Sequence, residues 1–308
     1  MTLIELFEMF PDDATAEKWL EYCRWGKEGA ECPRCKSRER VKETPNRRPA
    51  AYWCGACRRH FNVRTDTVMY RSNISLQKWV LAIYLHIKSR KGVSSMKLHR
   101  DIGITQKSAW FQLQRIRESK LLNEKLFFGP VEADETYVGG KERNRHFHKK
   151  LNLGRGTAGK FPVAGLKDRA TNQIRLQVVQ DTSAPTLQGF VREHIQEGVK
   201  VYTDQARAYQ GLSNHETVNN GCGQYVKGDV HVNGVESIWA IFKRSYMGIY
   251  HCVSPKHLHR YVSELEIRYN LRCFGTLDRM AMIFRGLIGK HLPYAQLIAT
   301  DLVSQKRF

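Results

Sequence analysis

Long apolar runs are missing from this sequence, and no segment approaches the roughly 20 apolar residues that a membrane-spanning helix needs. The sequence also lacks a basic amphipathic helix and a lipidation motif. Its first residues, MTLIELFEMFPDD, place acids among apolar side chains and contain no basic leader of a secreted protein. We therefore expect no membrane association and predict a cytoplasmic protein.

Acidic residues are scarce relative to basic ones: the 308 residues include 50 Lys and Arg but only 30 Asp and Glu, a formal net charge of +20. Such an excess favours a polyanionic partner, and nucleic acid is the default expectation. A chain of this length can also bury a large core and form more than one domain.

The eight cysteines of an intracellular chain are better interpreted as thiols or metal ligands than as disulfides. Two C-x-x-C pairs, Cys32 with Cys35 and Cys54 with Cys57, are separated by 18 residues. This spacing is typical of a zinc ribbon, in which two tight knuckles supply four thiolates. A complete thiolate shell leaves no open position, so we predict a structural Zn²⁺ ion. The alternative is four free thiols, and the other four cysteines have no such spacing.

Residues 72–125 have helical patterns throughout, with expected helices at 75–88, 94–101 and 106–119. The tight turn at 103–105 between the last two is typical of a helix-turn-helix DNA-binding domain. The polar side of the third helix suits contacts to phosphates and base edges, and we expect it to carry Gln106, Lys107, Ser108, Gln112, Gln114, Arg115 and Arg117. The alternative is a helical spacer with a solvated polar face.

From residue 129 the pattern changes to strands, expected at 130–140, 162–168, 174–180 and 199–204, with a helix at 184–197 before the last strand. This order predicts a mixed α/β layer. A basic segment at 141–160 interrupts it and can follow a phosphate backbone, through side chains that include Lys141, Arg143, Arg145, Lys149 and Lys150. The alternative is a disordered, solvated insertion.

A helix that starts near Asn233 has an apolar stripe of Val235, Ile238, Phe242 and Tyr246. Glu236 and Lys243 lie seven residues apart on its flank, at what we expect to be a partly sheltered edge.

Three carboxylates can converge at one edge of the predicted sheet: Asp134 on the first strand, Asp204 at the end of the fourth, and Glu236 on the later helix. Such carboxylates repel unless cations neutralise them, and hard oxygen ligands suit Mg²⁺. Two such ions can catalyse in-line phosphoryl transfer. Other acids can take one of these places, namely Glu135, Asp168, Asp181 and Asp229.

Several motifs together resemble the ISXO-type insertion-sequence transposases, over about residues 31–272: ADETYVGG, VYTDQARAY, GITQKSAWFQLQRIR and GDVHVNGVESIWAIFKR, beside the zinc ribbon. The resemblance implies a ribonuclease-H-like domain of the DDE type, with Asp134, Asp204 and Glu236 as the acidic triad and two Mg²⁺ ions. It also implies phosphate contacts by Lys243 and the adjacent Arg244, with Asn233 and, more weakly, His231 as further candidates for metal or DNA contact. The segment GCGQYV departs from the expected Gly-Glu-Tyr-Val, in a loop outside the triad.

The leading hypothesis is a nucleoid-associated bacterial transposase that binds the inverted repeats of an insertion element, cleaves double-stranded DNA and joins the ends to a target as a dimer or larger assembly. The alternatives are a DNA-binding regulator that has no catalytic activity and a nuclease without strand transfer. The predicted domains are a leader at 1–30, the ribbon at 31–71, the helix-turn-helix at 72–125, the catalytic domain at 126–273 and a helical tail at 274–308.

Overall fold

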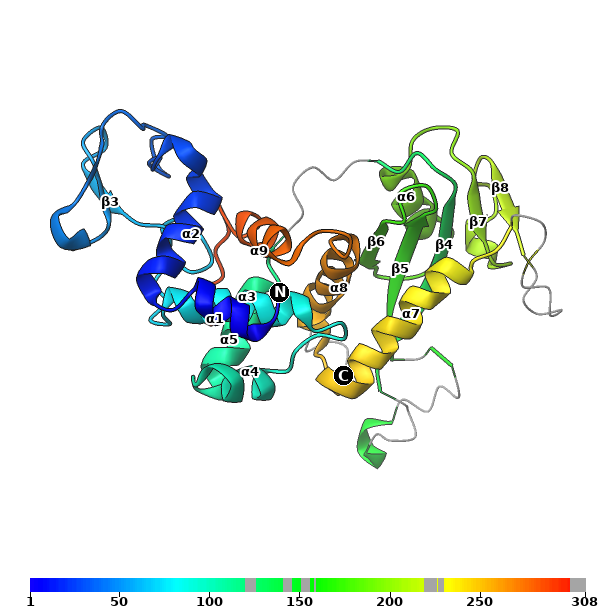
Figure 1. Ribbon diagram of the computed structural model, residues 1–308. Helices are drawn as coiled ribbons and strands as arrows, with labels where there is room; N and C mark the ends of the chain where they lie inside the picture. The colour runs from blue at the N-terminus through cyan, green and yellow to red at the C-terminus, as the bar shows by residue number, and fades with distance from the viewer. Residues whose placement is uncertain are drawn as a thin grey trace. The chain divides into compact units, whose positions relative to one another are not determined.

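The computed structural model describes residues 1–119, 126–140, 146–150, 156–157, 159–218, 226 and 230–299. The chain forms two compact units: one contains Met1–Leu122 with Cys273–Ala299, and the other contains Asn123–Arg272 (Figure 1). The second unit is thus inserted between two segments of the first. Among the described residues, no helix combines the length and apolar character needed to span a bilayer.

Polar caps set the starts of the helices in the first unit. Thr2, Asp12, Ser75, Ser94 and Thr105 each accept a hydrogen bond from the backbone N–H three residues later, which satisfies a donor that the first turn leaves free. The helices that follow these caps are α1 Leu3–Met9, α2 Asp13–Trp25, α3 Leu76–Lys88, α4 Ser95–Ile102 and α5 Gln106–Ile116. The sequence did not predict α1.

Helix α3 is the centre of this unit, since its residues from Trp79 to Ile87 are all buried. The C-terminal helices α9, Thr276–Arg285, and α10, Tyr294–Ile298, belong to the same unit. Helix α9 packs on α2 and α3, and the Ser119 hydroxyl donates to the Ile283 carbonyl oxygen at 2.9 Å. The tail therefore completes a core that the N-terminal segment begins.

A small antiparallel sheet lies between α2 and α3 in sequence. It consists of β1 Val41–Glu43, β2 Tyr52–Cys54 and β3 Arg59–Phe61, in the order β1-β2-β3. Tyr52 and Phe61 stack, and both meet Trp25 at the end of α2 edge-on, which attaches the sheet to that helix.

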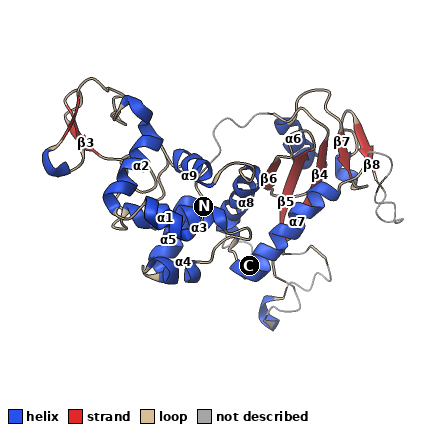
Figure 2. Ribbon diagram, in the orientation of Figure 1, coloured by secondary structure: helices blue, strands red, loops and turns tan. Residues whose placement is uncertain are grey.

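The second unit contains a five-stranded mixed sheet in the order β6-β5-β4-β7-β8, which confirms the predicted α/β layer (Figure 2). Its strands are β4 Val131–Val138, β5 Phe161–Asp168, β6 Ile174–Val178, β7 Val201–Thr203 and β8 His215–Thr217. The β4, β5 and β6 strands are antiparallel neighbours, and β7 runs parallel to both β4 and β8. The sequence did not predict β8.

Helices cover both faces of this sheet. On one face lies α6, Ala184–His194, over a core that includes Ala133, Leu166 and Val201. On the other face lie α7, Asn233–Ser245, and α8, Pro255–Asn270, over a core that includes Val138, Val163 and Leu176. Because side chains alternate along a strand, successive residues of β4 serve different cores.

Candidate active site and metal centre

Asp134 and Asp204 are neighbours across two strands of the second unit. The parallel pairing matches Val131 with Val201 and Glu132 with Tyr202. Continuing this register brings Asp134 level with Asp204, the residue directly after β7. The Asp134 carboxylate is directed to the face that α7 covers, since it contacts Trp239, and Asp204 Oδ1 accepts a hydrogen bond of 3.0 Å from the Ala206 backbone N–H.

The carboxyl group of Asp134 is half-buried and accepts a hydrogen bond from Trp239 Nε1 of α7 at 2.9 Å. The pKa of Asp134 is raised to about 7, first by burial and then by the charges of Glu135 and Asp204, against hydrogen bonds from the Glu135 backbone and Trp239 that lower it. This carboxylate therefore carries an electrostatic cost that a cation would relieve.

Glu135, the rival of Asp134 for the active position, points to the opposite face of β4. Its Oε2 accepts a hydrogen bond of 3.0 Å from the hydroxyl group of Tyr209, which is buried in the core beneath α6. Burial raises the pKa of Glu135, and Asp204 adds to this increase. The two adjacent acids are thus held by different layers of the unit, and Asp204 lies within electrostatic reach of both.

Glu236 lies in the first turn of α7, three residues before Trp239, and its side chain is exposed. Lys243, Arg244 and Asn233 are exposed as well, so the predicted sheltered edge for Glu236 and Lys243 is wrong. The buried stripe of α7 takes up the apolar side chains and Trp239, which leaves these charged residues on the solvent side. The three acids are not among the groups of potential metal ligands that the described part of the chain brings together.

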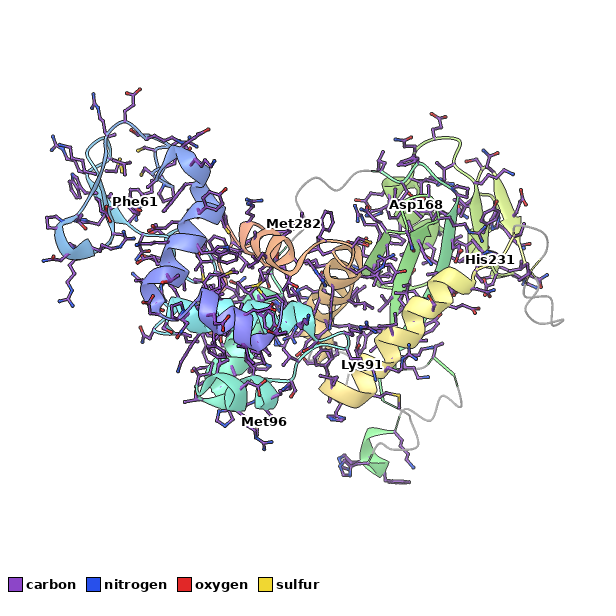
Figure 3. The ribbon with its side chains drawn as sticks, viewed as in Figure 1. Phe61, Lys91, Met96, Asp168, His231 and Met282 are labelled. Carbon is purple, nitrogen blue, oxygen red and sulfur yellow. The ribbon has the colours of Figure 1, made fainter. Side chains whose placement is uncertain are left out.

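Sequence reasoning missed Glu132, which is 1% exposed on the same face of β4 as Asp134. Its Oε1 accepts from Arg169 Nε at 2.8 Å, and its Oε2 accepts from the Val235 backbone N–H at 2.9 Å. The half-buried His231 places Nδ1 3.4 Å from the same carboxylate (Figure 3). Glu132 precedes Asp134 by two residues, and residues two apart on a strand share a face; this spacing in the sequence could have identified it.

The remaining rival acids have local partners or lie outside the described part. Asp168 is fully buried and accepts from the Ala170 N–H and the Thr171 hydroxyl, both at 2.9 Å. Asp181 accepts from Ser183 in the turn before α6. Asp229 lies outside the described residues.

The four cysteines Cys32, Cys35, Cys54 and Cys57 have Sγ atoms that all lie within 4.8 Å of one another, the one such group of potential metal ligands in the described part of the chain. The Sγ distances of 3.6 Å for Cys32–Cys57 and 3.5 Å for Cys35–Cys54 are close to the roughly 3.8 Å edge expected for a tetrahedron with Zn–S bonds of about 2.3 Å. The cluster fits a zinc ribbon and could hold a structural zinc ion.

The two zinc knuckles also share a backbone feature. Lys36 and Arg58, each directly after the second cysteine of a pair, have positive φ angles of 59° and 51°. A backbone N–H from Cys57 lowers the pKa of the Cys54 thiol to about 7, whereas burial and the neighbouring thiols raise that of Cys57 to about 12. A bound Zn²⁺ ion would favour the thiolate form of all four cysteines and neutralise their charges.

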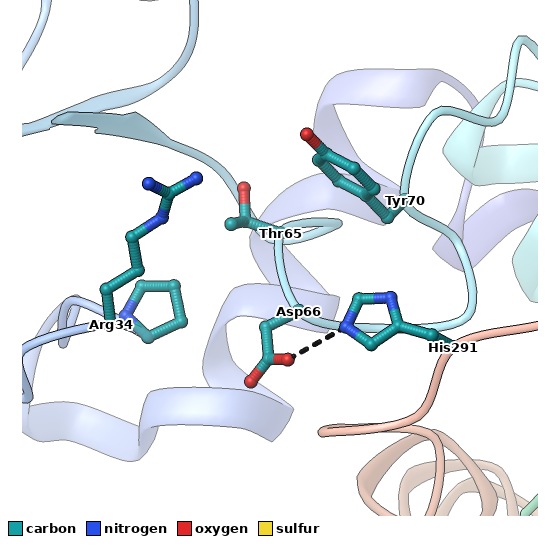
Figure 4. A pocket seen from close by; sticks show the side chains of 6 residues that line it. Arg34, Thr65, Asp66, Tyr70 and His291 are labelled. Carbon is teal, nitrogen blue, oxygen red and sulfur yellow. Dashed lines mark hydrogen bonds and ion pairs between the residues drawn. The ribbon is translucent and has the colours of Figure 1, made fainter.

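An open cavity of about 260 Å³ lies beside the first knuckle, lined by Pro33, Arg34, Thr65, Asp66, Tyr70 and His291 (Figure 4). His291 Nε2 lies 3.1 Å from Asp66 Oδ1. None of the predicted site residues lines this cavity.

On α5, the residues predicted to contact DNA divide into two groups. Gln106 and Lys107 are exposed and Ser108 is half-buried. In contrast, Gln112, Gln114 and Arg117 are buried, so their predicted place on an exposed polar side is wrong. Gln112 Nε2 donates to the Lys78 carbonyl of α3.

Arg115 has a structural role in the same unit. It is half-buried, its Nε donates to the Leu292 carbonyl at 3.3 Å, and its guanidinium lies over the Phe111 ring. The C-terminal tail covers this side of α5, which sequence periodicity could not reveal.

In the basic segment, Lys141, Arg143 and Arg145 lie outside the described residues, as does the side chain of Lys149, while Lys150 is exposed.

Comparisons with known proteins agree on one family. A model of the ISXO2-like transposase domain matches residues 127–270. A protein of Halobacterium salinarum, described as an uncharacterized protein in transposable element ISH50, is 32% identical over 272 residues, which cover 84% of this chain and 91% of that protein.

Proposed function

The chain belongs to the ISXO2-like transposase family, and from this premise we propose that it cuts and joins double-stranded DNA at the ends of an insertion element. Asp134, Asp204 and Glu236 form the acidic triad of this reaction. The observation that carries the proposal is the parallel pairing of β4, which carries Asp134, with β7, which Asp204 directly follows, together with the bond from Trp239 of α7, the helix of Glu236, to Asp134. The mixed sheet with helices on both faces supports assignment of the second unit as a ribonuclease-H-like domain.

The donor set fits the expected cation. Asp134 on β4 and Asp204 directly after the adjacent β7 carry hard oxygen ligands, and Glu236 is exposed on α7. Burial first, and then the charges of Glu135 and Asp204, raise the pKa of Asp134, so a cation beside it would be favourable. These residues would hold Mg²⁺, two ions in a DDE enzyme, which would activate the attacking oxygen and stabilise the leaving oxygen. Asp134 is held for this role by Trp239.

The basic side chains on α7, the helix that carries Glu236, suit the DNA backbone. Lys243 and Arg244 are exposed in the last turn of α7, and Asn233 is exposed at its start. We assign Lys243 and Arg244 to phosphates on either side of the cleaved bond. Water first hydrolyses the phosphodiester at the element end and leaves a 3′-hydroxyl group. That hydroxyl group then attacks a phosphodiester of the target and displaces its 3′ oxygen.

The first unit provides recognition of the element ends. A structural Zn²⁺ ion held by the four cysteines stabilises the ribbon, and the helix-turn-helix formed by α4 and α5 approaches the terminal repeats. Of the polar residues on α5, Gln106, Lys107 and Ser108 remain accessible for DNA. Because two ends are joined in one event, the active form is a dimer or larger assembly on DNA.

The test is Mg²⁺-dependent cleavage and joining of a duplex that carries the ends of the encoding element. Wild type is compared with Asp134→Asn, Asp204→Asn and Glu236→Gln, with Asp181→Asn as a control for an exposed acid, and DNA binding is measured in parallel. We expect the three triad variants to bind DNA without cutting it, and Asp181→Asn to behave as wild type. Activity in Glu236→Gln would refute Glu236 as the third metal ligand. A further variant, Glu135→Gln, tests the neighbouring acid of β4: if it loses activity while Asp134→Asn keeps it, Glu135 takes the place of Asp134 in the triad.

The products separate the other functions. Cleaved DNA without joined product would identify a nuclease, and binding without cleavage by wild type would identify a regulator.

A further inference from the structure

The indole ring of Trp239 lies over a glycine. Trp239 is 4% exposed, and beneath it Gly165 of β5 is the register partner of Asp134. A Cβ atom at Gly165 would lie 2.6 Å from two atoms of the ring and 3.0 Å from Leu176 Cδ2. A larger residue at position 165 would therefore displace the ring, and the glycine creates the space that the indole occupies.

From this position the indole reaches across to the neighbouring strand, where its N–H donates to Asp134 Oδ2 at 2.9 Å. An indole has one N–H and no acceptor, so the only hydrogen bond that this ring can donate is the one to Asp134. Leaving such a buried donor without an acceptor costs free energy, which makes the bond persistent.

A second bond attaches the same helix to the same strand. The Val235 backbone N–H donates to Glu132 Oε2 at 2.9 Å. The two acceptors belong to residues two apart on β4, and the two donors belong to residues four apart, about one turn, on α7. The two bonds therefore fix α7 to β4 on both sides of Glu236, and they set the orientation of the indole over Asp134.

We propose that Trp239 is a positioning residue that makes the site selective for Mg²⁺ over Ca²⁺ by restricting how Asp134 can bind a cation. The inference rests on the proposed role of Asp134 as a metal ligand. Mg²⁺ takes single oxygens in a strict octahedron, whereas Ca²⁺ accepts six to eight oxygens and often a bidentate carboxylate. With Oδ2 engaged by the indole N–H, bidentate binding by Asp134 is disfavoured, which penalises the larger ion.

The test is cation binding by the full-length protein without DNA, measured by titration calorimetry with Mg²⁺ and with Ca²⁺. Trp239→Phe keeps an aromatic ring over Gly165 and removes the N–H group. We expect the ratio of Ca²⁺ affinity to Mg²⁺ affinity to rise about tenfold in this variant, the scale of one hydrogen bond to a charged group. An unchanged ratio would overturn the inference, whether the two affinities stay the same or fall together. Loss of a purely structural contact lowers the affinity for both ions equally and leaves the ratio as it was.

Two further variants complete the experiment. Phe242→Leu loosens the packing of α7 one turn further along without touching the indole bond, and it is expected to leave the ratio unchanged; a tenfold rise in this variant too would overturn the inference. Asp134→Asn tests the premise. Cation binding retained in Asp134→Asn would overturn both the ligand set and this inference, whereas binding lost in Asp134→Asn with an unchanged ratio in Trp239→Phe would overturn the inference alone.

Discussion

Replacement of Asp134 by asparagine is expected to stabilise the metal-free protein at alkaline pH while it abolishes DNA cleavage. The ordinary pKa of an aspartate is 3.8, and that of Asp134 is about 7 in the folded protein, first because of burial and then because of Glu135 and Asp204. Between these values the folded protein holds a proton that the unfolded chain has released. Stability therefore falls as the pH rises from about 4 to about 7 and stays at its lower level above that range.

The size of the effect follows from the difference in pKa. About three pKa units correspond to at most about 4 kcal/mol, at 1.36 kcal/mol per unit. Asp134 is half-buried, so solvent screens part of this cost, and we expect about 2 kcal/mol. An asparagine cannot ionise, and its amide oxygen can still accept the hydrogen bond from Trp239. The Tm of Asp134→Asn should therefore exceed that of wild type by roughly 4–8 °C at pH 8.

The assay is thermal unfolding followed by circular dichroism in chelator, at intervals from pH 4 to pH 8. The difference in Tm should shrink as the pH approaches 4, and Mg²⁺ should raise the Tm of wild type alone. Asp181 provides a control of opposite sign, because hydrogen bonds from Ser183 and Thr186 lower its pKa; Asp181→Asn should lower the Tm at pH 8. A pH-independent difference, or a lower Tm for Asp134→Asn at pH 8, would refute the reasoning.

Three other substitutions test the remaining supports of the fold. Cys54→Ser should reduce bound zinc from one ion per chain to none, measured by atomic absorption, and should lower the Tm of unfolding. The control Cys273→Ser, at an exposed cysteine outside the cluster, should change neither the zinc content nor the Tm. Glu132→Ala should destabilise the second unit by about 3 kcal/mol in urea, because it leaves Arg169 beside an empty site; Glu216→Ala, in an exposed ion pair, should cost less than about 1 kcal/mol. Phe284→Ala should cost about 3–5 kcal/mol in the first unit, since this fully buried side chain would leave a cavity.

Local chemistry made parts of the fold predictable from the sequence. The C-x-x-C spacing requires only short knuckles, and it correctly predicted that the four cysteines come together. Ser94 and Thr105 cap helices that begin where the sequence indicated, because a cap depends on residues within one turn. The strand that carries Asp134 was likewise predicted from its own pattern, at 130–140 against an observed Val131–Val138.

Features that depend on distant segments were not predictable. Gln112 and Arg115 look like a solvent-facing pair, but Gln112 bonds to α3 and Arg115 to the tail, 177 residues away. The polar, three-residue β8 has no alternating pattern of its own and exists because β7 offers an open edge. The exposure of Glu236 and Lys243 depends on how α7 is rotated over the sheet, which the bonds to Glu132 and Asp134 determine.

The return of the C-terminal segment to the first unit has a genetic consequence. A premature stop codon after residue 272 would leave the sequences of the zinc ribbon, α4, α5 and all three triad acids intact. Judged by its motifs alone, the truncated protein would be expected to function. The stop codon would nevertheless remove α9, whose Met280, Ile283 and Phe284 are at most 1% exposed, together with the Ile283 carbonyl that accepts from Ser119. At roughly 1.5–3 kcal/mol for each buried side chain, the loss approaches the whole stability of an ordinary domain. Such a truncated copy would lose the fold of its first unit.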